Sequence, residues 1–561
     1  MKRSLRPWQE FVIVTLGYVV AAAVMTYPLL FQLQAGLVSH SIDVNILAWD
    51  NWWIQHALSS GQNIFYTTLM FFPPGVSLAS HSFSFTHTLI SALLQVFTDT
   101  TAAYNLAIWL IFPIAGLGMY WLARYVTHSR AAAWIGGLIF AFAPYHLTQA
   151  LGHPHLSYVQ FIPFAVLFIL KAIEAPRLRY VAGAIVALVL TAYAGPHLLV
   201  VTLTWLAIFL PFEFIAQRRR LQRPVLLALG SILIGTLVLS LPLILPAASD
   251  IAQGQSAEEL QTGDFDDTQT DALALLVPTR YHPIFGASLT ETYGFLGKNN
   301  QWMPYLGWLA LLLSAVGAIA QRRRSIGWLV SGLACLILAL GAQLRFYGVT
   351  YPAVPLPFAL LQNIFPFSFL RSPDRFNIIV SLPLAVLAAY GLAAILRRFA
   401  SSSARITITA LVTLVILFEY LSVPYPIMPP PETSPFITNL AHDSQPAAIL
   451  DLPMGRGPAK IYLYWQTLHH QPLVEGHVSR TPDRAYDFIE ANAALHALRR
   501  PEQSSDAPPD ADWQALAQAG IRYIIIHLPM TNVDQLQRYR AILDRPPVYA
   551  DRLVEVYAAA P

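Results

Sequence analysis

Residues 102–123 read AAYNLAIWLIFPIAGLGMYWLA, a run without one charged side chain. As a helix this run is about 33 Å long at 1.5 Å per residue, which matches the roughly 30 Å of hydrocarbon in a bilayer. Further apolar runs cover about 11–31, 131–148, 157–174, 180–195, 197–217, 224–246, 304–320, 326–341, 374–396 and 406–423. The sequence therefore predicts an α-helical polytopic membrane protein with about 11 transmembrane helices.

Composition excludes several other classes of protein. The chain has 561 residues, of which 55% are hydrophobic and 12% are charged, whereas a soluble domain carries about 25% charged residues. This apolar excess excludes a single soluble fold and intrinsic disorder. The formal net charge is only +3, and the sequence contains no basic patch interleaved with aromatic residues. We therefore expect no nucleic-acid partner. Cys335 is the single cysteine, which excludes an intrachain disulfide.

Charge is distributed unevenly along the chain. Residues 1–423 hold 39 of the 65 charged side chains, about 9% of that part, while residues 424–561 hold 26, about 19%. We therefore predict a transmembrane domain over 1–423 and a soluble α/β domain over 424–561, joined by a proline-rich linker.

Basic residues predict the orientation. If the N-terminus is cytoplasmic and each run crosses once, 18 of the 23 basic residues before position 424 lie on or beside the cytoplasmic side, as the positive-inside rule requires. The exceptions are Arg280, Lys298, Arg345, Arg371 and Arg375. A shorter apolar run at 83–97 would reverse this pattern if it spanned, so we interpret it as an interfacial or re-entrant helix. The protein is then expected in the plasma (inner) membrane with its C-terminal domain outside the cytoplasm.

The long outer loops at 32–101, 247–303 and 342–373 are where we expect function. In the first, Asp43 and Asp50 lie on nearly the same side of a predicted amphipathic helix, whose tryptophans would sit at headgroup depth. Asp43 is the candidate catalytic residue and Asp50 a candidate substrate ligand; the alternative is that both only face water. The acidic residues of 247–303, which include Asp271, indicate a solvated surface, with a calcium or magnesium site as the alternative.

Other outer-side residues are candidates for substrate binding. His153 and His155 flank a turn between two runs, and His282 precedes another run. Imidazoles there could bind phosphate or metal, or only form surface hydrogen bonds. Arg371 and Arg375 lie at membrane depth, where an unpaired charge is costly. Their guanidinium groups suit a lipid phosphate, unless they form internal pairs with Asp374 or Glu419.

The soluble domain has the pattern of a small α/β fold. Buried strands are predicted at 447–452 and 523–527, and helices at 512–518 and 531–543, the second opening with a capping pair of Thr531 and Asp534. A hairpin or edge strand is expected at 548–557. The stretch GHVSR at 476–480 is the most site-like segment of the domain, for which we expect a role in acceptor recognition or in packing over the membrane site.

Several short motifs occur together in one order along residues 10–400. They are ILAW at 46–49, FFPPG at 71–75, FAPY at 142–145, GH at 152–153, QFIP at 160–163 and RSPDRF at 371–376. In this order, with an early outer aspartate, the chain resembles the GT-C superfamily of membrane glycosyltransferases, which includes the protein O-mannosyltransferases and the lipid A aminoarabinose transferases. It is most similar to bacterial GT-C-like polytopic membrane proteins.

The resemblance implies a function. GT-C enzymes transfer a sugar from a polyprenyl-phosphate donor to an acceptor on the outer face, so Asp43 takes the position of a general base or a ligand of Mg or Mn, and the arginine pair would bind the donor phosphate. Many members carry a second acidic residue in this motif, where this chain has Asn45, and this puts the metal in doubt.

Three functions are compared on this basis. The leading hypothesis is a glycosyltransferase with a lipid-linked donor and a cell-envelope glycan, lipid or protein as acceptor. The alternative is a non-catalytic GT-C-like scaffold that binds a lipid, glycan or protein partner. A transporter is the third hypothesis. A transporter would show paired broken helices and charged residues at mid-membrane, and the sequence has few such features.

Overall fold

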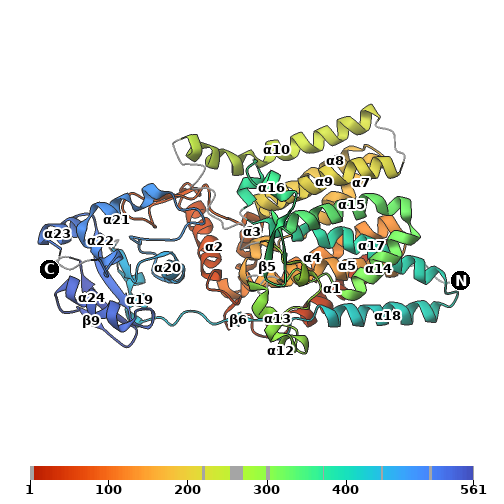
Figure 1. Cartoon of the computed structure of the whole chain (residues 1–561). Helices are drawn as coiled ribbons and strands as arrows, with labels where there is room; N and C mark the ends of the chain where they lie inside the picture. Colours follow the sequence, from red (N-terminus) through yellow and green to blue (C-terminus); the bar gives the residue numbers. More distant parts are fainter. Residues whose placement is uncertain are drawn as a thin grey trace. The chain divides into compact units, whose positions relative to one another are not determined.

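The computed structural model describes residues 6–217, 222–252, 269–297, 303–364, 366–370, 372–443, 447–503 and 508–559. The chain forms two compact units, each described here by itself (Figure 1). The helical unit comprises residues 1–40, 84–243 and 261–428, and the tail unit comprises residues 41–83, 244–260 and 429–561. Residues 41–83, most of the first predicted outer loop, thus fold with the tail unit, which the distribution of charge did not indicate.

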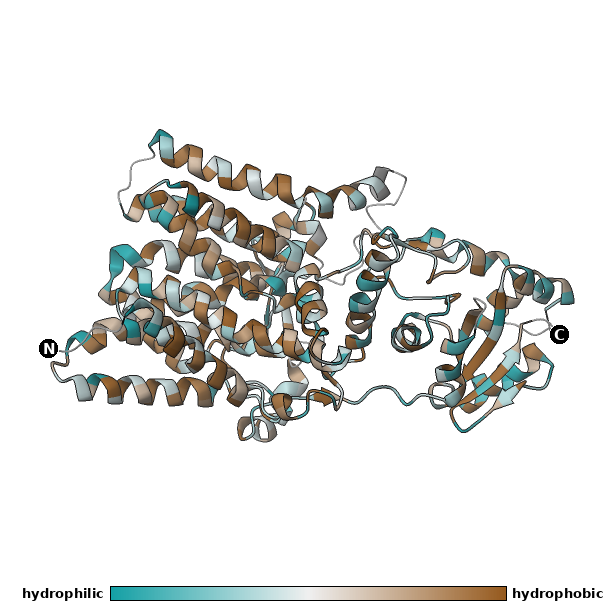
Figure 2. Cartoon of the chain, turned by 180° about the vertical axis from the view of Figure 1, so that it is seen from behind, coloured by the Kyte–Doolittle hydropathy of each residue, from teal (hydrophilic) through white to brown (hydrophobic). Residues whose placement is uncertain are grey.

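Each predicted apolar run coincides with helix in the structure. The helices are α1 (Pro7–Met25), α4 (Thr100–Thr127), α5 (Arg130–Ala141), α6 (Pro144–Gly152), α7 (Ile162–Glu174), α8 (Leu178–Ala194), α9 (Pro196–Ala216), α10 (Arg223–Ala252), α14 (Trp308–Ala320), α15 (Arg322–Ala339), α17 (Asn377–Arg397) and α18 (Ser402–Glu419). In Figure 2 the hydrophobic colour runs along these helices, whereas in the tail unit it concentrates on the strands. The predicted fold class, an α-helical membrane protein, is confirmed.

Seven helical stretches of the described chain are long and apolar enough to cross a membrane. They are Pro7–Met25, Thr100–Thr127, Arg130–Gly152, Pro196–Ala216, Arg223–Pro246, Pro373–Arg397 and Ser402–Glu419. Three shorter apolar helices accompany them: α3 (Phe85–Leu94), α8 and α14. The count of eleven crossings stays a prediction, as does the interpretation of 83–97, where α3 has 10 residues and is about 15 Å long.

Helix α17 forms the core of the helical unit. It is buried along nearly its whole length and packs against α5, α14 and α15. Two glycines let the backbones of α14 and α17 touch: a Cβ added at Gly391 would lie 1.9 Å from the carbonyl oxygen of Leu313, and one at Gly317 would lie 2.0 Å from that of Leu387. Small residues at such crossings are typical of helices that pack within a membrane.

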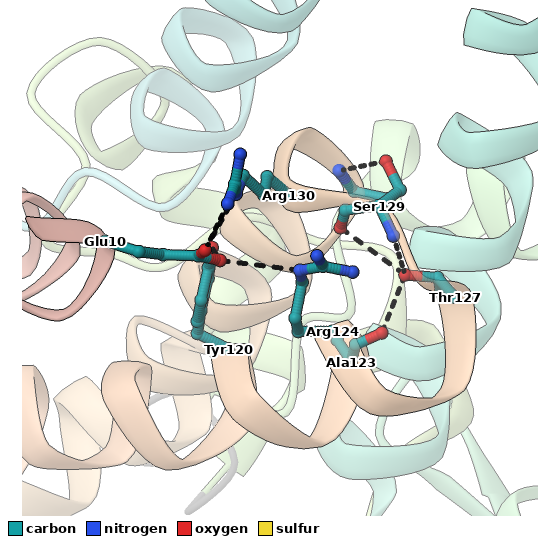
Figure 3. A network of polar contacts seen from close by, with 8 residues as sticks. Glu10, Tyr120, Ala123, Arg124, Thr127, Ser129 and Arg130 are labelled. Carbon is teal, nitrogen blue, oxygen red and sulfur yellow. Dashed lines mark hydrogen bonds and ion pairs between the residues drawn. The ribbon is translucent and has the colours of Figure 1, made fainter. Parts of the chain in front are cut away.

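A polar network joins the first helix to the unit (Figure 3). The carboxylate of Glu10 in α1 accepts hydrogen bonds from Tyr120 Oη at 2.6 Å and from Arg130 Nε at 2.8 Å, and Arg124 Nε lies 3.4 Å away. One acidic side chain thereby offsets two arginines that the sequence analysis places on the cytoplasmic side.

A buried aspartate organises the hairpin of β4 (Gln343–Phe346) and β5 (Val349–Pro355). Asp271 accepts hydrogen bonds from the backbone N–H groups of Tyr347 and Gly348 at 3.1 and 2.7 Å, and its side chain is fully buried. The expectation that Asp271 belongs to a solvated acidic surface is wrong, because its oxygens cap a turn inside the fold. The rest of that acidic run, Glu258, Glu259, Asp264, Asp266 and Asp267, lies outside the described residues.

The tail unit contains a mixed four-stranded sheet in the order β7-β8-β10-β9. β7 (Ala448–Leu452) runs parallel to β8 (Ile521–His527), which pairs antiparallel with β10 (Val554–Ala558), and β10 pairs with β9 (Tyr549–Ala550). Its helices include α19 (Pro435–Asn439), α20 (Arg456–His469), α21 (Asp487–Ala491), α22 (Ala493–Arg499), α23 (Asp510–Gln518) and α24 (Val533–Leu543). The predicted strands, the helix at 512–518 and the closing hairpin are confirmed.

Two details of the tail unit differ from the predictions. The last helix, α24, is capped by Asn532 and Gln535 rather than by Thr531 and Asp534, a shift of one residue that gives both side chains a backbone N–H partner. Helix α20, which follows β7 after the turn at Gly455, was not predicted, and it carries side chains of the candidate site.

The predicted amphipathic helix is α2 (Val44–Ser59), and it belongs to the tail unit. Trp49 and Trp53 are completely buried in the protein, where α2 packs against α20. The prediction that these tryptophans lie among lipid headgroups is wrong, because the apolar face of α2 is covered by another helix. Periodicity reveals an apolar face but not what covers it.

Candidate active site

Asp43 directly precedes helix α2, at its N-cap position, and it pairs with a lysine distant in sequence. Its carboxylate does not cap its own helix; Oδ1 instead accepts a hydrogen bond from the ammonium of Lys460 on α20. The side chains of Asp43 and Lys460 are 24% and 22% exposed. The carboxylate expected to be catalytic is therefore accessible to a substrate and held by a fixed cation.

Asp50 differs from Asp43 in being enclosed. It is only 3% exposed, and its Oδ1 lies 2.8 Å from Nε2 of His81. His81 Nδ1 accepts the backbone N–H of Ser479 at 3.0 Å, so the imidazole proton is on Nε2 and is donated to Asp50. Burial raises the pKa of Asp50, although His81 opposes that shift. Through Oδ1 and His81, Asp50 thus links α2 to the segment that holds Ser479, and its role as a substrate ligand stays a prediction.

The segment 475–481 surrounds the start of α20. Glu475 accepts the backbone N–H of Gly455 at 2.6 Å, and the guanidinium of Arg456 donates to the carbonyl of Val478 at 3.0 Å. His477 interacts electrostatically with Arg456, His81 and Lys460, and burial lowers its pKa to about 3. The stretch predicted to be most site-like thus lies beside the two predicted aspartates.

We name these residues the Asp43 cluster: Asp43, Asp50, His81, Arg456, Lys460, His477 and Ser479. Sequence reasoning missed Lys460 and Arg456. A signal was present, because Gly455 follows a buried strand, and basic residues four positions apart fall on one face of the helix that begins there.

A second group of predicted residues meets in the helical unit, around Asp374. This carboxylate accepts hydrogen bonds from Ser372 Oγ and, at 3.4 Å, from Tyr145 Oη. It also interacts electrostatically with Arg375 and His153. We name these four charged or phenolic residues (Tyr145, His153, Asp374 and Arg375) the Arg375 cluster. The cluster brings together His153 and Arg375, two predicted substrate ligands. It also includes Asp374, which the sequence analysis gave as an alternative, internal partner for the arginines.

His155 extends this group. Its ring centroid lies 5.7 Å from that of His153 and 5.5 Å from that of His197, in edge-to-face contacts. Across the described part of the chain, no three His, Cys, Asp or Glu side chains converge as a metal site would require.

Two other predicted ligands stand apart. His282 receives backbone N–H groups of Ile284 and Phe285 at Nδ1, and its Nε2 lies 2.8 Å from the carbonyl oxygen of Phe418. Both ring nitrogens thus form hydrogen bonds within the fold, and the role of His282 in substrate binding stays a prediction. Glu419, the other offered partner of the arginines, accepts the N–H of Leu309 at the start of α14. Arg371 lies outside the described residues.

Solved structures share the fold. ArnT from Cupriavidus metallidurans bound to undecaprenyl phosphate is 11% identical with a TM-score of 0.52, over 98% of this chain and 98% of ArnT. The archaeal oligosaccharyltransferase AglB from Archaeoglobus fulgidus, in complex with an inhibitory peptide and a dolichol-phosphate, is 12% identical with a TM-score of 0.50, over 96% of this chain and 71% of AglB.

The arabinofuranosyltransferase AftD from Mycobacteria is 14% identical with a TM-score of 0.58, and the match covers all of this chain but 40% of AftD, so this chain spans less than half of that protein. Comparison with curated proteins finds no matching sequence. At these identities the likeness establishes the fold alone, and it is the fold that the sequence motifs predicted. A family model described as Domain of unknown function (DUF6311) matches residues 14–418, and the chain belongs to that family.

Proposed function

We propose that this protein is a membrane glycosyltransferase that moves a sugar from a polyprenyl-phosphate donor to an acceptor hydroxyl of the cell envelope. The fold supports the proposal, since the ArnT structure contains undecaprenyl phosphate and the AglB structure contains a dolichol-phosphate. The observation that carries it is the state of Asp43: unlike Asp50, which is buried within α2, Asp43 at the N-cap of that helix has a substantially exposed carboxylate, paired with an ammonium.

Asp43 acts as the general base in this proposal. Its carboxylate takes the proton of the acceptor hydroxyl while the acceptor oxygen forms a bond to the anomeric carbon of the sugar. The bond between that carbon and the phosphate oxygen breaks, and its electron pair stays on the phosphate. The products are the glycosylated acceptor and polyprenyl phosphate.

Arg375 binds the donor phosphate in this proposal. A guanidinium offers two parallel donors to phosphate oxygens and remains charged at any physiological pH. Negative charge grows on the phosphate as the sugar leaves, so a cation placed there stabilises the transition state. Arg371 is proposed for the same role on its motif position alone, and His153 and His155 for contacts to the donor.

The location of the reaction is also a proposal. The positive-inside pattern supports a cytoplasmic N-terminus, eleven crossings in the plasma (inner) membrane and a tail unit outside the cytoplasm. The acceptor is then a glycan, lipid or protein of the envelope, and the 475–481 segment beside Asp43 is its proposed binding region.

The proposal is tested with purified protein in detergent, radiolabelled polyprenyl-phosphate sugars and envelope fractions as acceptors. Asp43→Asn is expected to lower turnover about 100-fold or more, the range of a general base. Asp443→Asn is the matched control, because Asp443 also forms a partly exposed ion pair in the tail unit, with Arg522 at 3.2 Å. Equal turnover in wild type and Asp43→Asn would overturn catalysis by Asp43.

A non-catalytic GT-C-like scaffold is the second candidate. Asn45 favours it, because this neutral and buried side chain stands where many GT-C members carry a second acidic residue. A scaffold would bind polyprenyl phosphate but would not transfer a sugar from a polyprenyl-phosphate donor. Asp43→Asn would leave that binding unchanged.

A further inference from the structure

Lys460 is held beside Asp43 by the fold and not only by their ion pair. Helices α2 and α20 are joined where Trp49 Nε1 donates to Gln466 Oε1 at 2.6 Å. Gln466 is completely buried and also donates to the carbonyl of Leu69 at 2.6 Å. Since Lys460 lies less than two turns before Gln466 on the same helix, this contact fixes the backbone position from which the lysine side chain reaches Asp43.

The residues around Asp43 do not fit the Mg or Mn ion that the GT-C resemblance suggested. Such ions prefer several oxygen ligands, and Mg²⁺ is usually held by one or two carboxylates together with waters and substrate phosphates. Asn45 is neutral and buried, and Asp50 is buried with its Oδ1 paired to His81. Lys460 already donates to Asp43 Oδ1, and a second cation on the same carboxylate would be repelled by the ammonium.

We propose that Lys460 takes the place of a divalent metal beside Asp43, as a positioning residue that keeps this carboxylate ionised and aimed during glycosyl transfer. The inference rests on the proposed function, and it makes the transfer independent of added metal. A neighbouring ammonium favours the ionised form of a carboxylate, as a metal ion does. Unlike a metal ion, it is part of the chain and needs no set of oxygen ligands around it.

Metal binding gives a readout that does not depend on activity. Mn²⁺ is titrated into the purified full chain, and free Mn²⁺ is followed by electron paramagnetic resonance. Wild type and Asp43→Asn are expected to give the same titration. Lys460→Glu, which replaces the ammonium with a second carboxylate, is expected to bind about one more Mn²⁺ than the double variant Lys460→Glu/Asp43→Asn.

Two results of this titration would overturn the inference. One is Mn²⁺ binding by the wild type that Asp43→Asn removes, which would mean that a metal and not Lys460 serves Asp43. The other is a Lys460→Glu variant, folded by circular dichroism and gel filtration, that gains no Mn²⁺. In that case a side chain at position 460 is not placed to share a metal ion with Asp43.

Transfer assays test the role in the reaction. Lys460→Gln is expected to lower kcat about 100-fold with the donor KM changed less than about threefold, while Lys460→Arg, which keeps the charge, restores kcat to within about tenfold of wild type. Arg522→Gln, which removes the cation of another ion pair in the tail unit, is the matched control and is expected to be unchanged. EDTA is expected to have no effect on wild type.

These outcomes separate the inference from the proposed function. Wild-type transfer that EDTA abolishes and Mn²⁺ restores overturns the inference and leaves the glycosyltransferase intact, and so does a Lys460→Gln variant as active as wild type. Absence of transfer by wild type with every donor and acceptor overturns the proposed function, and the Mn²⁺ titration then still decides whether Lys460 excludes metal from Asp43.

Discussion

The indole Nε1 of Trp49 donates a 2.6 Å hydrogen bond to the side-chain oxygen of Gln466, and the two residues are 417 positions apart in the chain. Both side chains are completely buried where α2 packs against α20. This bond joins the early Asp43 segment to a late helix of the same compact unit, and so it sets how Asp43 and Lys460 face each other.

Removing this hydrogen bond is expected to loosen both helices. Trp49→Phe leaves the buried oxygen of Gln466 without its donor, which costs about 1–3 kcal/mol. Hydrogen exchange measured by mass spectrometry should then become faster in α2 and α20. Trp52→Phe is the control, because Trp52 is only half-buried and stacks on His56 and His470. Equal effects of the two variants would contradict the role of the Trp49–Gln466 bond.

The tail unit is expected to lose stability as the pH falls. Burial lowers the pKa of His477 to about 3, while an unfolded histidine has a pKa of about 6.5. The folded state thus binds fewer protons than the unfolded state between these values, so the stabilisation is present above about pH 6.5 and is lost as the pH falls toward 3. Arg456, His81 and Lys460 shift the pKa of His477 in the same direction as burial does.

His477→Gln checks this sign. The free energy of opening of the sheet strands is measured by hydrogen exchange from pH 4.5 to 7. Its dependence on pH should be smaller in the variant, by the equivalent of about one proton fewer taken up on unfolding. His469, whose pKa burial also lowers to about 3, is present in both proteins, so the difference reports on His477. An unchanged slope would mean that His477 is protonated to the same extent in both states.

The contact of α14 with α17 is expected to tolerate no side chain at Gly391. A Cβ there would lie 1.9 Å from the carbonyl oxygen of Leu313, so Gly391→Ala must separate two backbones, at a cost of about 1–3 kcal/mol. Gly230→Ala in α10 is the matched control, since nothing lies within 4 Å of its added Cβ, and it should be neutral or stabilising. Thermal unfolding in detergent compares the two, and a Gly391→Ala variant as stable as Gly230→Ala would contradict the packing.

The proposed phosphate ligand is tested by a substitution that keeps its charge. Arg375→Lys retains the cation but loses the planar pair of donors, so the donor KM should rise about tenfold, equivalent to about 1.4 kcal/mol. Arg398→Lys, at the exposed far end of the helix that Arg375 precedes, should leave KM unchanged. If both variants keep the wild-type KM, Arg375 does not bind the phosphate through its guanidinium.

Local pattern was sufficient for much of the architecture. Long apolar runs have few ways to satisfy their backbone polar groups within a membrane, and every predicted run coincides with helix. In the tail unit, the strands predicted at 447–452 and 523–527 were evident from their apolar character, and the helix predicted at 512–518 is α23.

The candidate site was predictable only in part. Asp43 and Arg375 were identified because an unpaired charge near the membrane is costly and therefore indicates a partner or a ligand. The order of the GT-C motifs along the chain supported both residues. Asp50, His282 and Asp271 carry the same kinds of polar group, but in the structure one oxygen of Asp50 is paired with His81, and backbone groups bond to His282 and Asp271. Sequence alone does not distinguish an occupied polar group from an accessible one.

Tertiary structure decided what covers α2 and what stands beside Asp43. Periodicity showed that α2 has an apolar face, and lipid was the expected cover; α20 lies there instead. Lys460 reaches Asp43 across 417 positions, and a distance of that kind leaves no trace in local spacing, because it depends on how two amphipathic faces pack. Hydrophobic pattern is a property of each segment, whereas the pairing of segments is a property of the whole fold.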